Sequence, residues 1–296
     1  MRLLVIGANG LLGSNVVHAG EQAGCDVLGT YYSKEPSFDI PLVKFDLREY
    51  DSFDSLLSEY QPDVVINCAA MTDVDGCENS PEAAHILNGE APGELAARCR
   101  ASGVDFAHVS TDYVFDGRAR ERYAESSDPN PIQEYGASKL AGEQAVREEL
   151  PDALITRLSF VWGIHRGDGE LTGFPSWVRG QLESEQEVPL FTDQWVTPTR
   201  AGQAAEKLLE FIESDASGLY HLACSSCVTP YEFGEIIAKW VGNDSELLVE
   251  SSVDDVDRDA ARPTYSCLDV GRLESTVERA QPSLQEDVEA VADAFR

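Results

Sequence analysis

The stretch MRLLVIGANGLLG, residues 1–13, joins a short apolar run to a spaced set of glycines. The apolar run is typical of a buried strand, and the glycines follow it directly, at the start of a helical pattern. Glycine permits a tight turn and a close approach of the backbone to a pyrophosphate, while a helix N-terminus offers unpaired N–H groups. We therefore expect a dinucleotide-binding loop made by Gly7, Asn9, Gly10, Leu11, Leu12 and Gly13.

Outward from this stretch, apolar runs of strand length alternate with helical patterns. Such alternation is typical of βαβ units and predicts an α/β fold, a Rossmann-type doubly wound parallel sheet with helices on both faces. We expect strands at residues 3–7, 26–32, 63–70, 105–110 and 153–163, and helices at 10–24, 51–60, 81–103 and 135–150.

Beyond about residue 160 the order of elements loosens, with helices expected at 174–184, 201–214 and 230–242 and a strand at 218–224. We expect residues 1–160 to form an NAD(P)-binding Rossmann domain. Residues 161–296 are expected to form a smaller C-terminal substrate-binding lobe over the open edge of the sheet. The sequence has no Gly/Ser linker between the two parts, so we expect them to be interleaved.

Acidic residues dominate the charge of the chain, with 53 Asp and Glu against 22 Lys and Arg and a formal net charge of -31. The resulting field repels phosphate backbones and anionic lipids, which argues against nucleic-acid and membrane partners. The acids are spread over the whole chain and lysine is scarce, a pattern that favours a halophile's cytosol over an ordinary acidic enzyme. The N-terminal apolar run is too short for a signal peptide or a membrane span, so we expect a cytoplasmic protein.

The seven cysteines have no framework spacing, and reduced thiols are the expectation. The cluster CSSC, Cys224 to Cys227, with His221 upstream, is the one group with the composition of a metal or redox site. A zinc site needs a further ligand at matching spacing, and a redox pair needs its own helix N-terminus. We therefore interpret these cysteines as small buried residues that close a strand.

The tip of the second expected strand bears on the choice between NAD and NADP. An acid there accepts the ribose 2′-hydroxyl and repels a 2′-phosphate, but the strand runs into GTYYSKEP without one. Ser33 and Lys34 can contact a phosphate instead, although a solvated loop lysine is the alternative interpretation. Because the chain has only five lysines, we expect NADP(H) to be preferred over NAD(H).

The pair Tyr135 and Lys139 in YGASK lies four residues apart, and thus on one face of an expected helix. The motif STDYVFDG, residues 110–117, follows the strand at 105–110, where a parallel sheet presents its ligands. Thr111 can then orient a carbonyl oxygen that Tyr135 protonates. We expect the Lys139 ammonium to lower the pKa of Tyr135 from its ordinary value of about 10 and to hold the nicotinamide ribose. The alternative is that both side chains lie on the surface of a helix and have no catalytic role.

At these motifs the sequence resembles the extended short-chain dehydrogenase/reductase superfamily, and within it the dTDP-4-dehydrorhamnose reductase family. The resemblance covers nearly the whole chain, and its further segments are residues 63–78, the Asn88 region, 193–199, GLYHLAC, YEFGEIIA and 261–269. It implies NAD(P)H-dependent reduction of the 4-keto group of a nucleotide-linked deoxysugar, with dTDP-4-dehydrorhamnose converted to dTDP-rhamnose as the best match. It also suggests a homodimer, but we carry over no metal because the acids that link some members cannot be placed.

The resemblance also implies roles for individual residues. Hydride passes from the nicotinamide to sugar C4 and a proton from Tyr135 to O4, with Thr111 and Lys139 completing the catalytic trio. The cofactor contacts that it adds are Cys68, Ala69 and Ala70, with Asp46 and Leu47 near the adenine. The substrate contacts that it implies are Thr72, Val74, Asp75, Thr111, Asp112 and Phe160. Phe160 stands where family members commonly carry a tryptophan, and Trp162 lies two residues on, so the sugar is left open.

Three other functions fit parts of the pattern. A nucleotide-sugar dehydratase would have Thr-Asp-Glu after the fifth strand, but Tyr113 occupies the position of the glutamate. A nucleotide-sugar epimerase is not excluded by that residue, although the motifs after residue 160 fit it less well. A non-enzymatic binder is the third, because the regulatory beta subunit of methionine adenosyltransferase resembles the same family and an intact cofactor site does not prove turnover.

Overall fold

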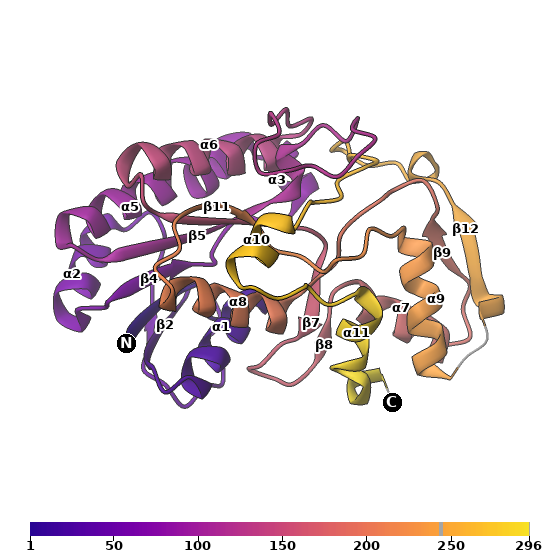
Figure 1. The fold of residues 1–296 in the computed structure, drawn as a ribbon, viewed down its shortest axis with the longest axis horizontal. Helices are drawn as coiled ribbons and strands as arrows, with labels where there is room; N and C mark the ends of the chain where they lie inside the picture. The colour runs from indigo at the N-terminus through magenta and orange to yellow at the C-terminus, as the bar shows by residue number, and fades with distance from the viewer. Residues whose placement is uncertain (243–244, 296) are drawn as a thin grey trace.

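A seven-stranded parallel sheet forms the centre of the computed structural model, which describes residues 1–242 and 245–295 (Figure 1). The strand order β11-β6-β5-β4-β1-β2-β3 reverses between β1 and β4, which confirms the expected doubly wound fold. The strands are β1 (Arg2–Ile6), β2 (Asp26–Tyr31), β3 (Leu42–Lys44), β4 (Val64–Asn67), β5 (Asp105–Thr111), β6 (Leu154–Leu158) and β11 (Gly218–His221).

Helices cover both faces of this sheet (Figure 1). One layer contains α1 (Leu11–Gln22) and α8 (Ala201–Glu213), and the other contains α2 (Tyr50–Tyr60), α5 (Ala91–Ser102) and α6 (Glu134–Glu149). Alternate side chains of β1 enter different cores, because successive residues of a strand point to opposite faces. Leu3 and Val5 pack toward α1 and α8, whereas Leu4 and Ile6 pack toward the other layer. Outside the smaller lobe the structure also has α3 (Val74–Asn79), α4 (Pro81–Ala84), a π-helical stretch (His85–Glu90) and α10 (Gly271–Thr276).

The chain returns to the large sheet after residue 200, which corrects the expected assignment of 161–296 to one lobe. Helix α8 packs against α1, and β11 pairs in parallel with β6, with Gly218 opposite Leu154. The apolar face of α8 enters the same core as β1. Amphipathic spacing shows that a helix has a buried face but does not show which sheet that face covers.

The smaller lobe lies at one end of the sheet (Figure 1) and has its own core around Trp162, Leu190 and Phe233. Its strands are β7 (Val161–Ile164), β8 (Leu171–Thr172), β9 (Val188–Phe191), β10 (Thr199–Arg200) and β12 (Leu248–Ser251), and its helices are α7 (Phe174–Glu183), α9 (Pro230–Val241) and α11 (Leu284–Glu289). The single strand expected at 153–163 is in fact two strands, β6 and β7. Phe160 separates them with a φ of 46°, in the left-handed region, and so turns the chain from one sheet into the other.

Cys227 and Cys267 form a disulfide, with 5.6 Å between their Cα atoms, so the expectation of reduced thiols is wrong for this pair. The bond joins the turn before α9 to the segment that precedes α10. Forty residues separate the two cysteines, and no local spacing signals such a pairing. Cys224 is a free, buried thiol. Over residues 1–242 and 245–295, no group of three or more ligating side chains is placed to hold a metal ion. In that same part of the chain, no helix has the length and apolar character to cross a membrane.

The net charge of -31 leads to a prediction about salt. We expect the Tm to rise steeply with potassium chloride, because the screening length falls from about 10 Å at 0.1 M to about 3 Å at 1 M. Self-repulsion of the compact state is then relieved. Circular dichroism melts across this range measure the effect. Sucrose stabilises proteins by exclusion without screening charge, so a Tm that rises no more in the salt than in sucrose would contradict the prediction.

Candidate active site

A cavity of about 620 Å³ opens beyond the carboxyl ends of β1, β4 and β5, where the strand order reverses. Open parallel sheets bind their ligands at this position. The cavity collects most of the residues expected from the sequence, which come from segments far apart in the chain. Those lining it are Gly7, Asn9, Gly10, Leu11, Leu12, Ser33, Lys34, Cys68, Ala69, Ala70, Thr72, Val74, Thr111, Asp112, Tyr135, Lys139 and Phe160.

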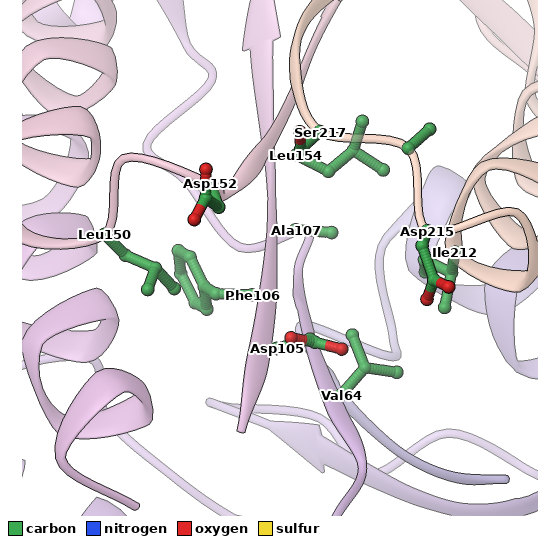
Figure 2. A pocket seen from close by; sticks show the side chains of 11 residues that line it. Val64, Asp105, Phe106, Ala107, Leu150, Asp152, Leu154, Ile212, Asp215 and Ser217 are labelled. Carbon is green, nitrogen blue, oxygen red and sulfur yellow. The ribbon is translucent and has the colours of Figure 1, made fainter. Parts of the chain in front are cut away.

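A depression of about 270 Å³ lies near the opposite end of β5 and β6 (Figure 2). Its polar wall carries Asp105, Asp152 and Asp215. Carboxylates repel the phosphates of a nucleotide, and the amino ends of parallel strands are not where such ligands bind. The larger cavity is therefore the candidate site.

The glycine loop lines the cavity and depends on close backbone contacts that side chains would prevent. Gly7 has a φ of 82°, and a Cβ there would lie 2.9 Å from the backbone nitrogen of Ala69. Gly10 precedes α1, and no side chain of the described residues caps that helix. The first N–H groups of α1 are therefore free to bind a ligand at this end of the cavity. Gly13 lies outside the cavity lining. A Cβ on Gly13 would collide with the carbonyl oxygen of Gly7, so this glycine serves the packing of α1 on the loop.

Asp46 and Leu47, expected near the adenine, are not brought into the cavity lining. The Arg48 guanidinium donates two hydrogen bonds to Asp46, of 2.9 Å and 2.5 Å, and holds the pKa of that carboxyl below its usual range. Leu47 is buried in the core beside α2. Tyr31 and Tyr32 line this end of the cavity instead, next to Ser33 and Lys34.

The loop after β4 is tied to α6 through the π-helical stretch. Asn88 accepts a hydrogen bond from the Met71 N–H at 2.8 Å and donates to the Met71 carbonyl at 2.9 Å and to Ser138 at 3.1 Å. Thr72 and Val74, which follow, line the cavity. Asp75, expected to contact substrate, turns away and accepts hydrogen bonds from Arg262, which lines a neighbouring cavity.

Thr111, Tyr135 and Lys139 meet in the cavity from two elements. Thr111 ends β5, while Tyr135 and Lys139 lie one turn apart at the start of α6. Gly136 lets α6 approach the end of β5 closely, because a Cβ there would collide with the carbonyl oxygen of Tyr113. The arrangement brings two hydroxyls and one ammonium to the wall of one cavity.

The pKa of Tyr135 is raised, not lowered as the sequence predicted. Burial is the main cause, and a hydrogen bond with Thr111 opposes it. Lys139 does not offset this rise, and its ammonium donates a hydrogen bond of 2.6 Å to the carbonyl oxygen of Val109. Burial lowers the pKa of Lys139 to about 8, opposed by the charge of Glu143. The phenol of Tyr135 is therefore protonated at physiological pH.

A buried ion pair between Arg157 and Glu143, which was not expected from the sequence, lies close to Lys139. Arg157 donates hydrogen bonds of 2.8 Å and 2.7 Å to the carboxylate of Glu143, and Ser110 donates a third of 2.6 Å. The side chains of Arg157 and Glu143 are only 3% and 1% exposed. Glu143 lies four residues after Lys139 on the same helix, so helical spacing could have indicated that the two side chains share a face.

Asp112 also lies beneath the trio and is buried. It accepts hydrogen bonds from Thr111 at 3.1 Å and from Ser159 at 2.7 Å. Burial raises the pKa of Asp112 to about 6, although these hydrogen bonds oppose the shift. This carboxyl group therefore orients the Thr111 hydroxyl.

A second cavity of about 450 Å³ adjoins the first and shares Tyr113 and Phe160 with it. It carries Arg258 and Arg262, two cations in a strongly acidic chain, beside an aromatic wall. The aromatic residues are Phe174, Trp177 and Phe191, with Arg258 stacked 5.0 Å over the ring of Phe191. The sequence analysis did not select these residues, although the scarcity of cations was a signal.

Phe160, rather than Trp162, faces the two cavities. Its ring packs 5.2 Å from that of Phe174, measured between centroids. Trp162 is fully buried against Phe233 and cannot reach a ligand. The left-handed backbone at Phe160 is what brings this ring to the boundary between the two cavities.

Comparison with known proteins gives consistent matches. The sequence model of the family described as RmlD substrate binding domain matches residues 1–296. A probable low-salt glycan biosynthesis reductase, Agl14 of Haloferax volcanii, is 51% identical over 295 residues, covering 100% of this chain and 98% of that protein. The structure of a dTDP-4-dehydrorhamnose reductase from Clostridium acetobutylicum has a TM-score of 0.88 at 29% identity and covers 99% of each chain. The same reductase from Bacillus anthracis, solved in complex with NADP, has a TM-score of 0.85 at 27% identity, covering 98% of this chain and 97% of that one.

Proposed function

This chain belongs to the dTDP-4-dehydrorhamnose reductase family, and we propose that it uses NADPH to reduce the 4-keto group of dTDP-4-dehydrorhamnose. As a member of that family it is an NAD(P)H-dependent oxidoreductase. The observation that carries the proposal is one cavity holding both the glycine loop and the Thr111–Tyr135 hydroxyl pair, joined to a second cavity with two arginines. The first suits a cofactor and a ketone, and the second suits a nucleoside diphosphate.

The chain's own residues supply the proton and the orientation for the reaction. A bound nicotinamide cofactor would supply the hydride that C4 of the sugar accepts. Tyr135 donates its phenolic proton to O4, so the C=O bond becomes an alcohol and the tyrosine becomes a phenolate. Thr111 would orient O4 by turning its hydroxyl, which donates to Asp112 in this structure, toward that oxygen. The Lys139 ammonium stabilises the phenolate until solvent returns the proton.

The second cavity accounts for the nucleotide end of the substrate. Arg262 is held by Asp75 through hydrogen bonds of 2.7 Å and 3.3 Å, which presents its guanidinium in a fixed orientation. Arg258 and Arg262 together match the two charges of a diphosphate, and the aromatic wall provides a stacking surface for a base. Phe160 lies between the two cavities, where the sugar would be held.

The proposal also includes a preference for NADPH and a use for the reduced sugar. Ser33 and Lys34 line the cavity without an acid at the tip of β2, which supports a preference for NADPH. The relative from Haloferax volcanii is named as a glycan biosynthesis reductase, which supports use of the reduced sugar in glycan assembly.

The test is oxidation of NADPH, with NADH in parallel, by the purified protein in about 1 M or more potassium chloride with dTDP-4-dehydro-L-rhamnose. We expect turnover with a higher kcat/KM for NADPH. Arg262→Gln should raise the KM for the sugar about tenfold or more with kcat little changed, because a charged hydrogen bond contributes about 1.5–3 kcal/mol. The exposed Arg120 provides the control, Arg120→Gln. Turnover of UDP- or GDP-linked ketosugars but not of the dTDP-linked one would contradict the proposal.

A further inference from the structure

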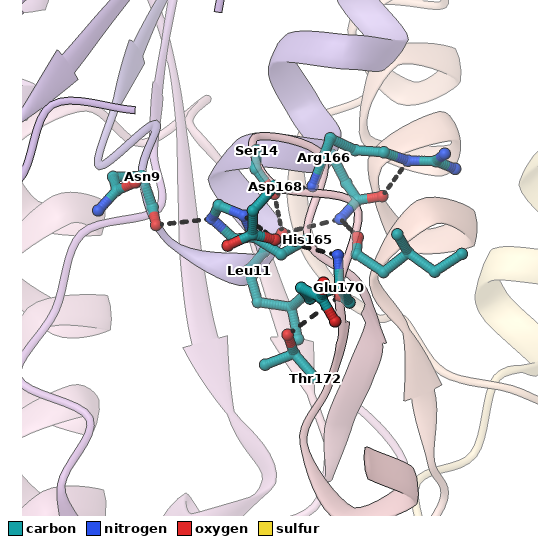
Figure 3. A network of polar contacts seen from close by, with 10 residues as sticks. Asn9, Leu11, Ser14, His165, Arg166, Asp168, Glu170 and Thr172 are labelled. Carbon is teal, nitrogen blue, oxygen red and sulfur yellow. Dashed lines mark hydrogen bonds and ion pairs between the residues drawn. The ribbon is translucent and has the colours of Figure 1, made fainter. Parts of the chain in front are cut away.

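Polar contacts join the smaller lobe to the large sheet at more than one place. The loop at residues 165–170, between β7 and β8, lies against α1, where the Arg166 N–H donates to the Ser14 hydroxyl at 3.1 Å (Figure 3). At the other place the Ser159 hydroxyl, at the start of the lobe, donates to Asp112 at 2.7 Å. Only the second of these two contacts contains an ionisable group that also touches Thr111.

Asp112 is enclosed by hydroxyl groups. Its side chain is buried, with the residue 2% exposed, and its two oxygens accept hydrogen bonds from Thr111 at 3.1 Å and from Ser159 at 2.7 Å. Burial raises the pKa of this carboxyl to about 6, and hydrogen bonds from Ser266, Ser159 and Thr111 oppose the rise. Both charge states of Asp112 are therefore accessible to the folded protein within an ordinary pH range.

The hydroxyl of Thr111 has one proton to donate and two lone pairs. In the structure the proton is directed to Asp112, and one lone pair accepts the Tyr113 N–H at 3.2 Å. A ketone oxygen is only an acceptor, so Thr111 can hold it only by withdrawing its proton from Asp112. An ionised Asp112 would then lose a charge-assisted hydrogen bond in a buried place. A protonated Asp112 can instead donate its own proton to Thr111, which frees the Thr111 proton for the ketone.

We propose that Asp112 is a positioning residue whose proton directs the Thr111 hydroxyl toward the ketone oxygen, so that the protonated form of Asp112 is the more active one. This inference rests on the reductase function proposed above. Tyr113 in the same turn and Tyr135 on α6 face Asp112, and Lys139 lies in the same cavity. The pKa of each tyrosine is raised and that of Lys139 is about 8, so these groups keep their charge as Asp112 titrates. The segments after β6 and before α10 contribute serine hydroxyls, which do not titrate.

The first test is kcat/KM for dTDP-4-dehydro-L-rhamnose between about pH 5 and pH 7.5 in high potassium chloride, with NADPH saturating at each pH. We expect the wild-type value to fall roughly tenfold to a plateau as pH rises through about 6, because the ionised form must give up a charge-assisted hydrogen bond. Asp112→Asn should give a profile without this fall, since an amide can donate to Thr111 and does not titrate. A repeat with NADH, which has no 2′-phosphate, separates the effect from titration of the cofactor.

Asp287→Asn is the matched control. Asp287 is also buried and its pKa is also raised to about 6, but it pairs with Arg200 in the smaller lobe and lines neither cavity. This variant should keep the wild-type inflection. Ser159→Ala removes a hydrogen bond to the charged form of Asp112, so it should move the inflection to higher pH. Thermal melts identify a variant that has failed to fold, and Ser159→Ala decides if Asp112→Asn is one.

The second test needs no substrate. Infrared difference titration of the carboxyl band, wild type against Asp112→Asn, measures the pKa of Asp112 directly. We expect a midpoint at about 6 that moves to higher pH in Thr111→Val, which removes another hydrogen bond to the charged form.

Turnover without an inflection near pH 6, an inflection that persists in Asp112→Asn, or an infrared midpoint that Thr111→Val does not move would each overturn the proposal. Absence of ketosugar turnover with the infrared shift intact would instead contradict the reductase function. That result would support the contact between Asp112 and Thr111, so the two failures are distinguishable.

Discussion

Tyr135→Phe is expected to lower kcat for ketosugar reduction by about 10²–10⁴-fold while leaving the Kd of NADPH within about twofold. In the proposed reaction the Tyr135 phenol donates the proton, and its raised pKa keeps it protonated over the working pH range. Phenylalanine retains the ring and its edge-on packing 6.0 Å from Tyr113, so the cavity is preserved. Steady-state kinetics give kcat, and fluorescence titration gives the Kd.

Tyr60→Phe is the control for this substitution, because the Tyr60 hydroxyl donates to the carbonyl of Asp26 at the amino end of β2, and neither residue lines the cavity. This variant should turn over like the wild type. Retention of more than about a tenth of kcat by Tyr135→Phe would assign the proton to another group. Weakened NADPH binding with kcat intact would assign Tyr135 to cofactor binding alone.

Glu143→Gln is expected to lower the free energy of unfolding by about 3–5 kcal/mol. The substitution leaves the Arg157 guanidinium buried without its counter-charge, and this penalty exceeds the loss of an exposed ion pair. Urea denaturation at constant high salt measures the change. Glu149→Gln is the matched control, because Glu149 pairs with Arg100 on the surface, and about 0–1 kcal/mol is expected there.

The same substitution should also alter the pH profile of catalysis. The Glu143 charge raises the pKa of Lys139 against the effect of burial, so its removal lets the ammonium lose its proton at lower pH. Because the ammonium stabilises the phenolate, kcat/KM should fall as pH rises through about 8 in the wild type, and at lower pH in Glu143→Gln. A stability loss no larger than that of Glu149→Gln, or an unmoved alkaline limb, would show that the buried pair does not support the trio.

A double variant distinguishes an effect of Glu143 on Lys139 from a general loss of stability. Replacing both partners, Glu143→Leu with Arg157→Met, should recover much of the lost stability, because an apolar pair carries no desolvation cost. The alkaline limb should stay shifted in this double variant, since the Glu143 charge is still absent. Recovery of stability without recovery of the pH profile would therefore locate the effect on Lys139.

The sequence alone determined the features that depend on residues close together in the chain. The apolar run of β1, the glycines after it and the four-residue step from Tyr135 to Lys139 are local features that can be read directly from the sequence. The parallel sheet then requires the segments after β1, β4 and β5 to meet at one edge, and this accounts for most of the cavity lining.

Tertiary structure decided the pairings between distant residues. Asp75 and Arg262 are 187 residues apart, and Cys227 and Cys267 are 40 apart. The Lys139 ammonium points toward the Val109 carbonyl rather than the Tyr135 phenol, and local sequence patterns do not predict this direction either. Periodicity shows which face of an element is buried, but the partner on that face is set by packing and desolvation over the whole molecule. For that reason the sequence selected most of the residues that line the cavity, while the electrostatics of these residues required the fold.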